Sequence, residues 1–354
     1  MPESGGAPAV CVINHQGAAW LESTLGAIAA SGVEFGERLL VDAGSTDRSL
    51  EIAARHPEFR VIELGANRGP GAARNRGLEE TGARRVLFVD ADVAVEPVCA
   101  TRLADALAAD ARAAVAVPVV RHADDPGTIQ YAGAEAHFLG MMAPRETGRP
   151  FPLADPEPRE VGAAVTACFM VDRERIGGVR FDESFFIYQE DLDFSLRVRA
   201  RGATILLVPE ASCLHGAGTP GLSLRATGRY MPLRVFCLVR NRWQVILVTY
   251  ASGTLARLWP ALAAYEAAQL AGAIRNGWMR EWLRAAAWLV RHAGEVTVKR
   301  RVVQDGRTVG DLALLSGGRI PIRPEAVPGR LGRAALHRLE RGSELAWRLA
   351  RRGA

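Results

Sequence analysis

The chain has 354 residues, of which 49% are hydrophobic and 23% charged, so it can bury a sizeable core and is not a disordered chain. Its 44 basic residues outnumber its 39 acidic ones, which gives a formal net charge of +5. A basic balance suits nucleic acid, a membrane surface or acidic substrates, but the sequence contains no nucleic-acid-binding motif, so we expect no nucleic-acid partner.

The first half of the chain alternates strand-like and helix-like segments. Residues 1–8 lack a basic region and a long apolar core, so we expect no signal peptide and a cytoplasmic protein. The expected strands are 9–14, 38–41, 60–64, 85–89 and 113–119, and the expected helices are 18–30, 45–55, 71–80 and 96–109. This order predicts an α/β fold with a mainly parallel sheet flanked by helices, where ligands bind outside the carboxyl ends of the strands.

The pattern weakens in the middle of the chain and then changes character. Residues 120–160 are rich in Pro, Gly, Asp and His and are interpreted as a variable loop region beside the site. Regular structure is expected again at 163–171, in a helix over 190–201 and in a strand over 203–208. After residue 230 the sequence predicts a helical region, so we divide the chain into 1–229 and 230–354.

The C-terminal region contains two strongly apolar stretches and a basic helical pattern. Residues 236–251 and 255–274 are interrupted by charged residues, so neither offers the ~18 uninterrupted apolar residues of a spanning helix. Buried helices and helices lying on a membrane remain equal alternatives. Residues 331–352 place leucines such as Leu345 and Leu349 on one face and arginines on the other, which suits an anionic membrane surface, with a solvated face as the alternative.

The five cysteines are scattered and lack a C-x-x-C spacing. Cys11, Cys168 and Cys237 lie in apolar runs, as buried thiols do. Neither a disulfide framework nor a zinc site is therefore expected.

Carboxylates follow two of the predicted strands. Asp90 and Asp92 stand two residues apart at a strand end, where an extended chain projects both side chains to one side. Magnesium is usually held by one or two carboxylates, and substrate phosphates fill other positions. Asp42 lies one residue beyond another apolar strand, where its carboxylate could accept a hydrogen bond from a nucleobase.

Further candidates lie on a glycine-rich turn, an acidic helix start and a later strand end. The turn at 67–77 opens a helix, and backbone amides there favour anions, but Arg74 replaces the last glycine of a dinucleotide fingerprint. Glu190 and Asp191 stand at a helix start, where acids are common for dipole reasons, but they follow an unusually aromatic run. His215 is flanked by glycine after a strand and could complete a metal shell.

Five motifs occur in one order along the chain: Asp42-x-Gly-Ser-Thr-Asp47, Asn67-x-Gly69 with Ala73-Arg74-Asn75-x-Gly77, Asp90-x-Asp92, Phe181-Asp182-Glu183, and Glu190-Asp191 with His215. Together they resemble family 2 glycosyltransferases of the GT-A fold, particularly the bacterial rhamnosyltransferase-like branch, over residues 8–250. The resemblance implies an inverting transfer of a sugar, with rhamnose as one candidate, from a nucleotide-diphosphate donor. It also implies Mg²⁺ or Mn²⁺, a saccharide or lipid-linked hydroxyl acceptor in cell-surface polysaccharide or glycolipid synthesis, and peripheral contact with the inner face of the membrane.

The resemblance also implies a role for each motif residue. The nucleotide would be bound by Asn14, Asp42, Asn67 and Arg74, with Asp42 contacting the nucleobase. Asp90 would contact ribose or metal, Asp92 would bind metal, and His215 would contact metal or diphosphate. Asp191 would be the general base, with Glu190 beside it. We expect the helix-start position of Asp191 to favour its ionised form.

The sequence departs from the family pattern at a few positions and leaves rival functions open. Gln189 replaces a common glycine, and Arg242-Trp243 lacks the Gln of the Q-x-x-R-W motif of processive synthases, so we favour a non-processive enzyme. A sugar-phosphate nucleotidyltransferase would need a basic, glycine-rich loop after the first strand, and Gly17-Ala18-Ala19 lacks the basic residue. A catalytically silent nucleotide-sugar-binding protein is the other rival, and metal-dependent donor hydrolysis discriminates it.

Overall fold

The computed structural model describes residues 6–216, 231–322 and 329–352, and its centre is one mixed sheet. The main strands follow the order β10-β12-β6-β11-β4-β1-β2-β3, while β5 pairs with β12 and β7 with β6. The strands of this sheet are β1 (Ala9–Asn14), β2 (Glu37–Asp42), β3 (Arg60–Glu63), β4 (Arg85–Asp90), β5 (Val93–Val95), β6 (Ala113–His122), β7 (Ile129–Ala132), β10 (Arg159–Glu160), β11 (Cys168–Asp172) and β12 (Thr204–His215).

The N-terminal half of the sheet is parallel, as predicted, but the sheet as a whole is mixed. Strands β3, β2, β1 and β4 run parallel, and β6 runs parallel to β12. Strand β11 lies between β4 and β6 and is antiparallel to both, so β6 does not continue the N-terminal series. The strand-helix alternation could not reveal this insertion, because β11 comes more than fifty residues after β6 begins.

The loop interpretation of residues 120–160 is wrong in part. Strand β6 extends to His122, and β7 and β10 pair with the main sheet. Strands β8 (Ala134–His137) and β9 (Met141–Pro144) form a separate two-stranded sheet. These strands are short, with two to four residues each for β7, β8, β9 and β10, so periodicity along the chain gave no signal for them.

The sheet is covered on both faces, because successive side chains of a strand point to opposite sides. Val10 and Val12 pack with α1 (Leu21–Ala29), α2 (Ser49–Ala53) and α4 (Cys99–Ala109) in one apolar cluster. Cys11 and Ile13 pack in the other cluster, with α3 (Pro70–Glu80) and α5 (Glu190–Ala200). All five cysteines are buried and free, as expected.

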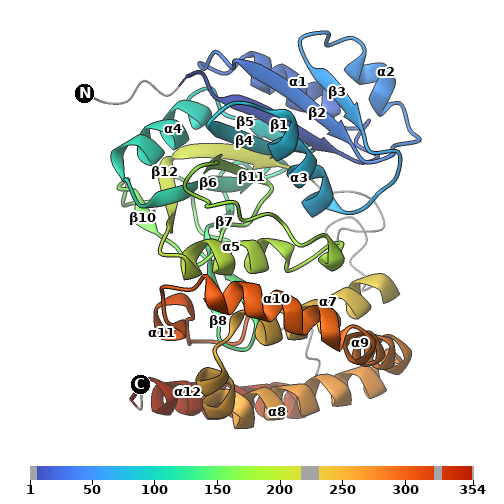
Figure 1. The fold of residues 1–354 in the computed structure, drawn as a ribbon, viewed down its shortest axis with the longest axis vertical. Coiled ribbons are helices and arrows are strands. Elements are labelled where there is room, and N and C mark those ends of the chain that lie inside the picture. Colours follow the sequence, from blue (N-terminus) through green and yellow to red (C-terminus); the bar gives the residue numbers. More distant parts are fainter. Residues whose placement is uncertain (1–5, 217–230, 323–328, 353–354) are drawn as a thin grey trace.

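Helix α5 is buried on two sides and joins the sheet to the C-terminal helices (Figure 1). Its Phe194 and Val198 face the sheet, and its Leu192 and Leu196 belong to a third cluster built with the C-terminal helices. The C-terminal helices are α7 (Pro232–Thr249), α8 (Ser252–Arg275), α9 (Met279–Arg291), α10 (Ala293–Asp305), α11 (Asp311–Leu314) and α12 (Arg330–Arg352). The predicted boundary at 229/230 adjoins residues outside the described ranges and stays a prediction.

The two apolar stretches of the C-terminal region have different surroundings. Helix α7 is a core helix whose Arg240 and Arg242 are buried, whereas α8 exposes Trp259 and Ile274. No described helix has both the length and the apolar character needed to cross a membrane. The amphipathic face predicted for α12 packs only in part: Leu339 contacts the third cluster, whereas Leu345 and Leu349 are exposed and Trp347 is buried instead.

Candidate active site

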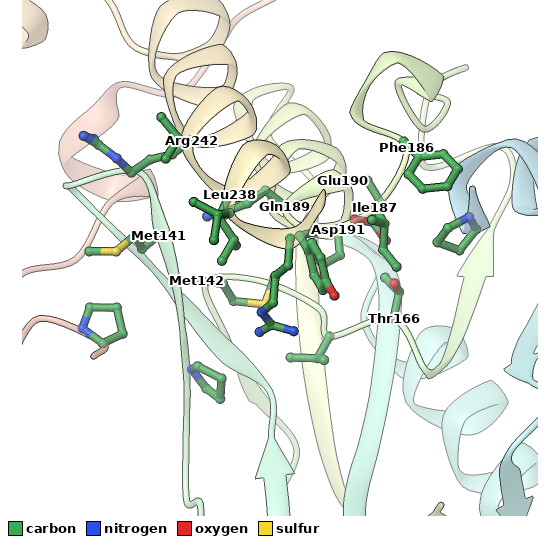
Figure 2. A pocket seen from close by; sticks show the side chains of 18 of the residues that line it. Met141, Met142, Thr166, Phe186, Ile187, Gln189, Glu190, Asp191, Leu238 and Arg242 are labelled. Carbon is green, nitrogen blue, oxygen red and sulfur yellow. The ribbon is translucent and has the colours of Figure 1, made fainter. Parts of the chain in front are cut away.

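A cavity of about 2440 Å³ opens where the carboxyl ends of β1 and β4 meet the starts of α3 and α5. Figure 2 shows part of its wall, where Glu190, Asp191 and Gln189 lie near Met142, Leu238 and Thr166. The predicted site residues in its lining are Asn14, Asn67, Arg74, Asp90, Asp92, Glu190, Asp191 and His215. The fold therefore brings together seven candidates from three of the five motifs and Asn14 from the first strand. Asp42 does not line the cavity.

Arg74 is a buried cation between two of these acids. Its side chain is 2% exposed, and Nη2 donates to Asp90 Oδ1 at 2.8 Å and to the carbonyl oxygen of Thr166 at 2.9 Å. Its Nη1 lies 3.7 Å from Glu190 Oε1. The rings of Phe169 and Phe181 flank the guanidinium. The position of Arg74 between the acids gives it an electrostatic role inside the protein that its motif did not indicate.

The two adjacent acids at the start of α5 have different pKa values, and both values are raised. Burial raises the pKa of Glu190 to about 8, and the Asp191 carboxylate adds to this rise. Burial also raises the pKa of Asp191 to about 6, although its Oδ1 accepts a hydrogen bond from the Leu192 amide. At neutral pH Glu190 is therefore mostly protonated and Asp191 mostly ionised. Backbone amides at the helix start do lower the pKa of Asp191, as expected, but desolvation outweighs them and gives a net rise.

The loop before α5 adopts an unusual backbone. Phe186, Tyr188 and Gln189 have φ of 62°, 68° and 68°, in the left-handed region that side chains rarely occupy. Such conformations persist only where the surrounding structure enforces them, and they gather at functional sites. The sequence departure at Gln189 thus falls at a position where glycine would be unstrained.

The nucleotide-side candidates lie at the carboxyl ends of β1 and β2 and in the turn before α3. Asp42 is 1% exposed, and it accepts from Asn14 Nδ2 at 2.6 Å and from the Ser45 amide at 2.8 Å. It thus positions Asn14 and the turn after β2, and its direct contact with a base stays a prediction. Asn67 Oδ1 accepts from the Gly69 amide at 2.9 Å and so shapes the turn that opens α3.

Asp92 and His215 lie side by side at the ends of β4 and β12. His215 Nε2 is 3.4 Å from Asp92 Oδ1, and its Nδ1 is 2.8 Å from Gln130 Oε1. The contact with Gln130 requires the Nδ1 atom to carry the proton in the neutral ring, which leaves the Nε2 lone pair toward Asp92. Within the described ranges, no group of three or more His, Cys, Asp and Glu residues is placed to hold a metal by itself.

Comparison with known proteins shows which family the N-terminal part of the chain is similar to. A family model described as glycosyl transferase family 2 matches residues 9–176. Residues 9–176 are therefore similar to family 2 glycosyltransferases, over slightly less than half of this chain. The matched segment contains strands β1 to β11, the Asp90-x-Asp92 motif and Arg74, whereas Glu190 and Asp191 lie just beyond it.

A curated relative is the N-acetylglucosaminyl-diphospho-decaprenol L-rhamnosyltransferase of Mycobacterium tuberculosis, which is 32% identical over 202 residues. The alignment covers 50% of this chain and 65% of the relative, so the chain spans about two thirds of that protein's length. The resemblance to the rhamnosyltransferase-like branch is confirmed at the level of sequence similarity.

Solved structures share the fold of the glycosyltransferase domain. A structure of GalNAc-T7 with UDP, GalNAc and Mn²⁺ superposes with a TM-score of 0.57 at 17% identity, covering 75% of this chain and 52% of the other. Residues 1–349 of S. aureus TarS in complex with UDP-GlcNAc give a TM-score of 0.53 at 16% identity, covering 97% and 92%. The predicted GT-A fold with a C-terminal helical region is confirmed.

The structure adds site residues that sequence reasoning did not select. Thr166 supplies the carbonyl that holds Arg74, and Gln130 orients His215. Asn241 on α7 donates to carbonyl oxygens of the loop before Glu190. Only Asn241 had a signal, because it interrupts an apolar helix beside Arg242-Trp243, whereas contacts of Thr166 and Gln130 are visible only in three dimensions.

Proposed function

We propose that the protein is an inverting glycosyltransferase that moves a sugar from a nucleotide-diphosphate donor to an acceptor hydroxyl. The observation that carries this proposal is the pair of unequal acids, Glu190 and Asp191, in the same cavity as Asp90 and Asp92. The similarity to family 2 glycosyltransferases, and the UDP and UDP-GlcNAc present in structures of similar fold, support a nucleotide-sugar donor.

The chemical step requires one base opposite the leaving diphosphate. The acceptor hydroxyl oxygen attacks the anomeric carbon, Asp191 takes the hydroxyl proton, and the bond to the diphosphate breaks, so the nucleoside diphosphate leaves with the electron pair. Asp191 suits this role because it is mostly ionised at neutral pH, and a pKa near the working pH favours a general base. Protonated Glu190 is a neutral neighbour and can donate a hydrogen bond to the acceptor.

The donor set of Asp90, Asp92 and His215 fits a Mg²⁺ or Mn²⁺ ion only with help from the substrate. Two carboxylates and an imidazole nitrogen face the same part of the cavity, and phosphate oxygens of the donor would have to complete the coordination. A bound cation would neutralise charge on the leaving diphosphate. The protein's own part includes keeping Asp90 in place, which Arg74 does through its hydrogen bond.

The far part of the cavity supports an acceptor with an apolar portion. Its lining continues from Asp191 along α7, α8 and α12, with Leu238, Ala268, Leu336 and Leu339 among the residues that face it. The name of the mycobacterial relative describes a lipid-diphosphate acceptor and rhamnose as the sugar. We therefore propose a lipid-linked acceptor in cell-surface glycan synthesis, with rhamnose as the first sugar to test.

Exposed apolar side chains on the C-terminal helices support contact with a membrane surface. Trp259, Leu283, Val290 and Leu349 come from α8, α9 and α12, and each is more than half exposed. Arginines are frequent on the same helices, and basic amphipathic helices bind anionic lipid surfaces. A peripheral position at the cytoplasmic face of the membrane would bring a lipid-linked acceptor to the cavity.

Nucleotide release from a panel of nucleotide sugars, with and without an acceptor, tests the proposed function. Asp191→Asn should lower turnover by about 10²–10⁴-fold, because it removes the base. Glu190→Gln should have a much smaller effect, because the amide resembles a carboxyl group that is already neutral at pH 7. NMR should show inverted anomeric configuration in the product. Donor binding without any release in the wild-type protein would instead identify a silent binding protein, and an active Asp191→Asn enzyme would refute the assignment of the base.

A further inference from the structure

The loop before α5 leads directly into Glu190 and Asp191, and the C-terminal helices contact this loop. The 3-10 helix η1 (Glu183–Phe185) ends at Phe185 and α5 begins at Glu190, so residues 186–189 form the loop between them. Three of the four residues between them have left-handed backbone conformations without being glycine. Among the described residues, backbone amides bond the carbonyl oxygens of Phe185 and Gln189 but not those of the residues between them, so the remaining carbonyl groups need other partners.

One side chain on α7 satisfies most of these carbonyl groups. Asn241 is fully buried, and its Nδ2 atom lies 3.0 Å from the carbonyl oxygen of Phe185, 2.9 Å from that of Ile187 and 2.6 Å from that of Tyr188. Arg240 Nε donates to Asn241 Oδ1 at 2.8 Å, which fixes the orientation of the amide. Arg240 Nη2 also donates to the Phe185 carbonyl at 2.6 Å.

The opposite side of the loop rests on the turn before α3. A Cβ atom on Gly69 would come within 1.9 Å of the Phe186 carbonyl oxygen, so the two backbones are in direct contact. Gly69 itself has φ of 90° and follows Asn67, which lines the cavity. The loop is thus enclosed between the nucleotide-side turn and α7, and its position fixes where α5 and Asp191 begin.

We propose that Asn241 is a positioning residue for the transfer reaction. It acts through the main chain of residues 185–188 and fixes Glu190 and Asp191 relative to Arg74 and the acceptor. The inference rests on the proposed function for its kinetic consequence, and it assigns the C-terminal region a part in catalysis beyond binding an acceptor. Asn241 touches no reacting atom, so its loss should affect the transfer step more than donor binding.

The test compares Asn241→Ala with two other variants in the full chain. Gln304→Ala is the matched control, because the Gln304 amide on α10 also donates to two carbonyls of α7, those of Val248 and Thr249, but at the end far from the loop. Arg240→Met removes one loop bond and the anchor of the Asn241 amide, so it should be intermediate. We expect Asn241→Ala to lower kcat by about 10²-fold with donor KM within about twofold of wild type.

A second measurement does not depend on turnover. Hydrogen–deuterium exchange of peptides covering residues 183–192 should rise in Asn241→Ala and stay unchanged in Gln304→Ala. Equal kcat losses in these two variants, or unchanged exchange of the loop in folded Asn241→Ala, would overturn the proposal; if Asn241→Ala does not fold, Arg240→Met decides by the same readouts. A wild-type protein inactive on every donor would refute the proposed function, and the exchange data would still decide the role of Asn241.

Discussion

Replacing Arg74 with methionine should shift the pH dependence of catalysis toward higher pH. The guanidinium is 2% exposed and lies 2.8 Å from Asp90 Oδ1 and 3.7 Å from Glu190 Oε1. It also lowers the pKa of Asp191, which burial raises to about 6. Methionine keeps much of the side-chain volume between Phe169 and Phe181 but removes a positive charge that lowers the pKa of Asp90, Glu190 and Asp191.

The size of the shift follows from the separation of the charges. Two unit charges about 4 Å apart interact by about 4 kcal/mol at an effective dielectric constant of ~20, which corresponds to about three pKa units. Water entering the space of the guanidinium reduces this figure, and Asp191 is farther from the cation than Glu190 is. We therefore expect the pKa of Asp191 to rise by about one unit, from about 6 to near neutrality.

The assay is the pH profile of kcat/KM for donor turnover between pH 5 and 9. If Asp191 is the base, as proposed, activity is lost as pH falls through its pKa, and Arg74→Met should move this acid limb upward by about one pH unit. Arg76→Met is the control, because Arg76 on the same helix is half exposed and pairs with Glu80. An acid limb at the same pH in wild type and Arg74→Met, with both proteins folded, would refute this electrostatic reasoning.

Two further predictions concern the metal and the membrane. Asp92→Ala should abolish the Mg²⁺ or Mn²⁺ dependence of donor binding in calorimetry; donor binding by wild type that chelator leaves unchanged would contradict the metal assignment. The double variant Leu345→Ser and Leu349→Ser should bind anionic liposomes less than wild type in flotation, because both leucines are more than half exposed on a basic helix. Failure of both proteins to float would contradict membrane contact.

The sequence predicted the acids of the site well, because local patterns encode them. Asp90, Asp92, Glu190 and Asp191 each follow a recognisable strand or precede a helix, and the carboxyl ends of strands in such sheets face one ligand site. Their shared cavity confirms that placement. The same logic was incomplete for Asp42. A carboxylate at a strand end can also hydrogen-bond within the protein instead of facing the cavity, as Asp42 does with Asn14 and the Ser45 amide.

The sequence could not predict features that depend on burial and long-range pairing. The raised pKa of Asp191 requires knowledge of what covers the start of α5, and the helix dipole alone suggested the opposite sign. Strand β11 inserts between β4 and β6 through pairings with distant segments. The exposed Leu345 and Leu349 illustrate the same limit, since an amphipathic pattern does not say which face a helix packs.

The C-terminal helices also have contacts that the sequence did not predict. Their apolar sequence suggested either helices lying on a membrane or helices buried in the core. Helix α7 instead supplies Asn241 to the loop before the acids, and Lys299 on α10 donates to Asp182 Oδ1 and Ser184 Oγ, both at 2.8 Å. Since these helices hold the segment that buries Glu190 and Asp191, they also help to set the desolvation that separates the two pKa values. We therefore expect a change at the C-terminal helices to alter the pKa of Asp191 without contacting it.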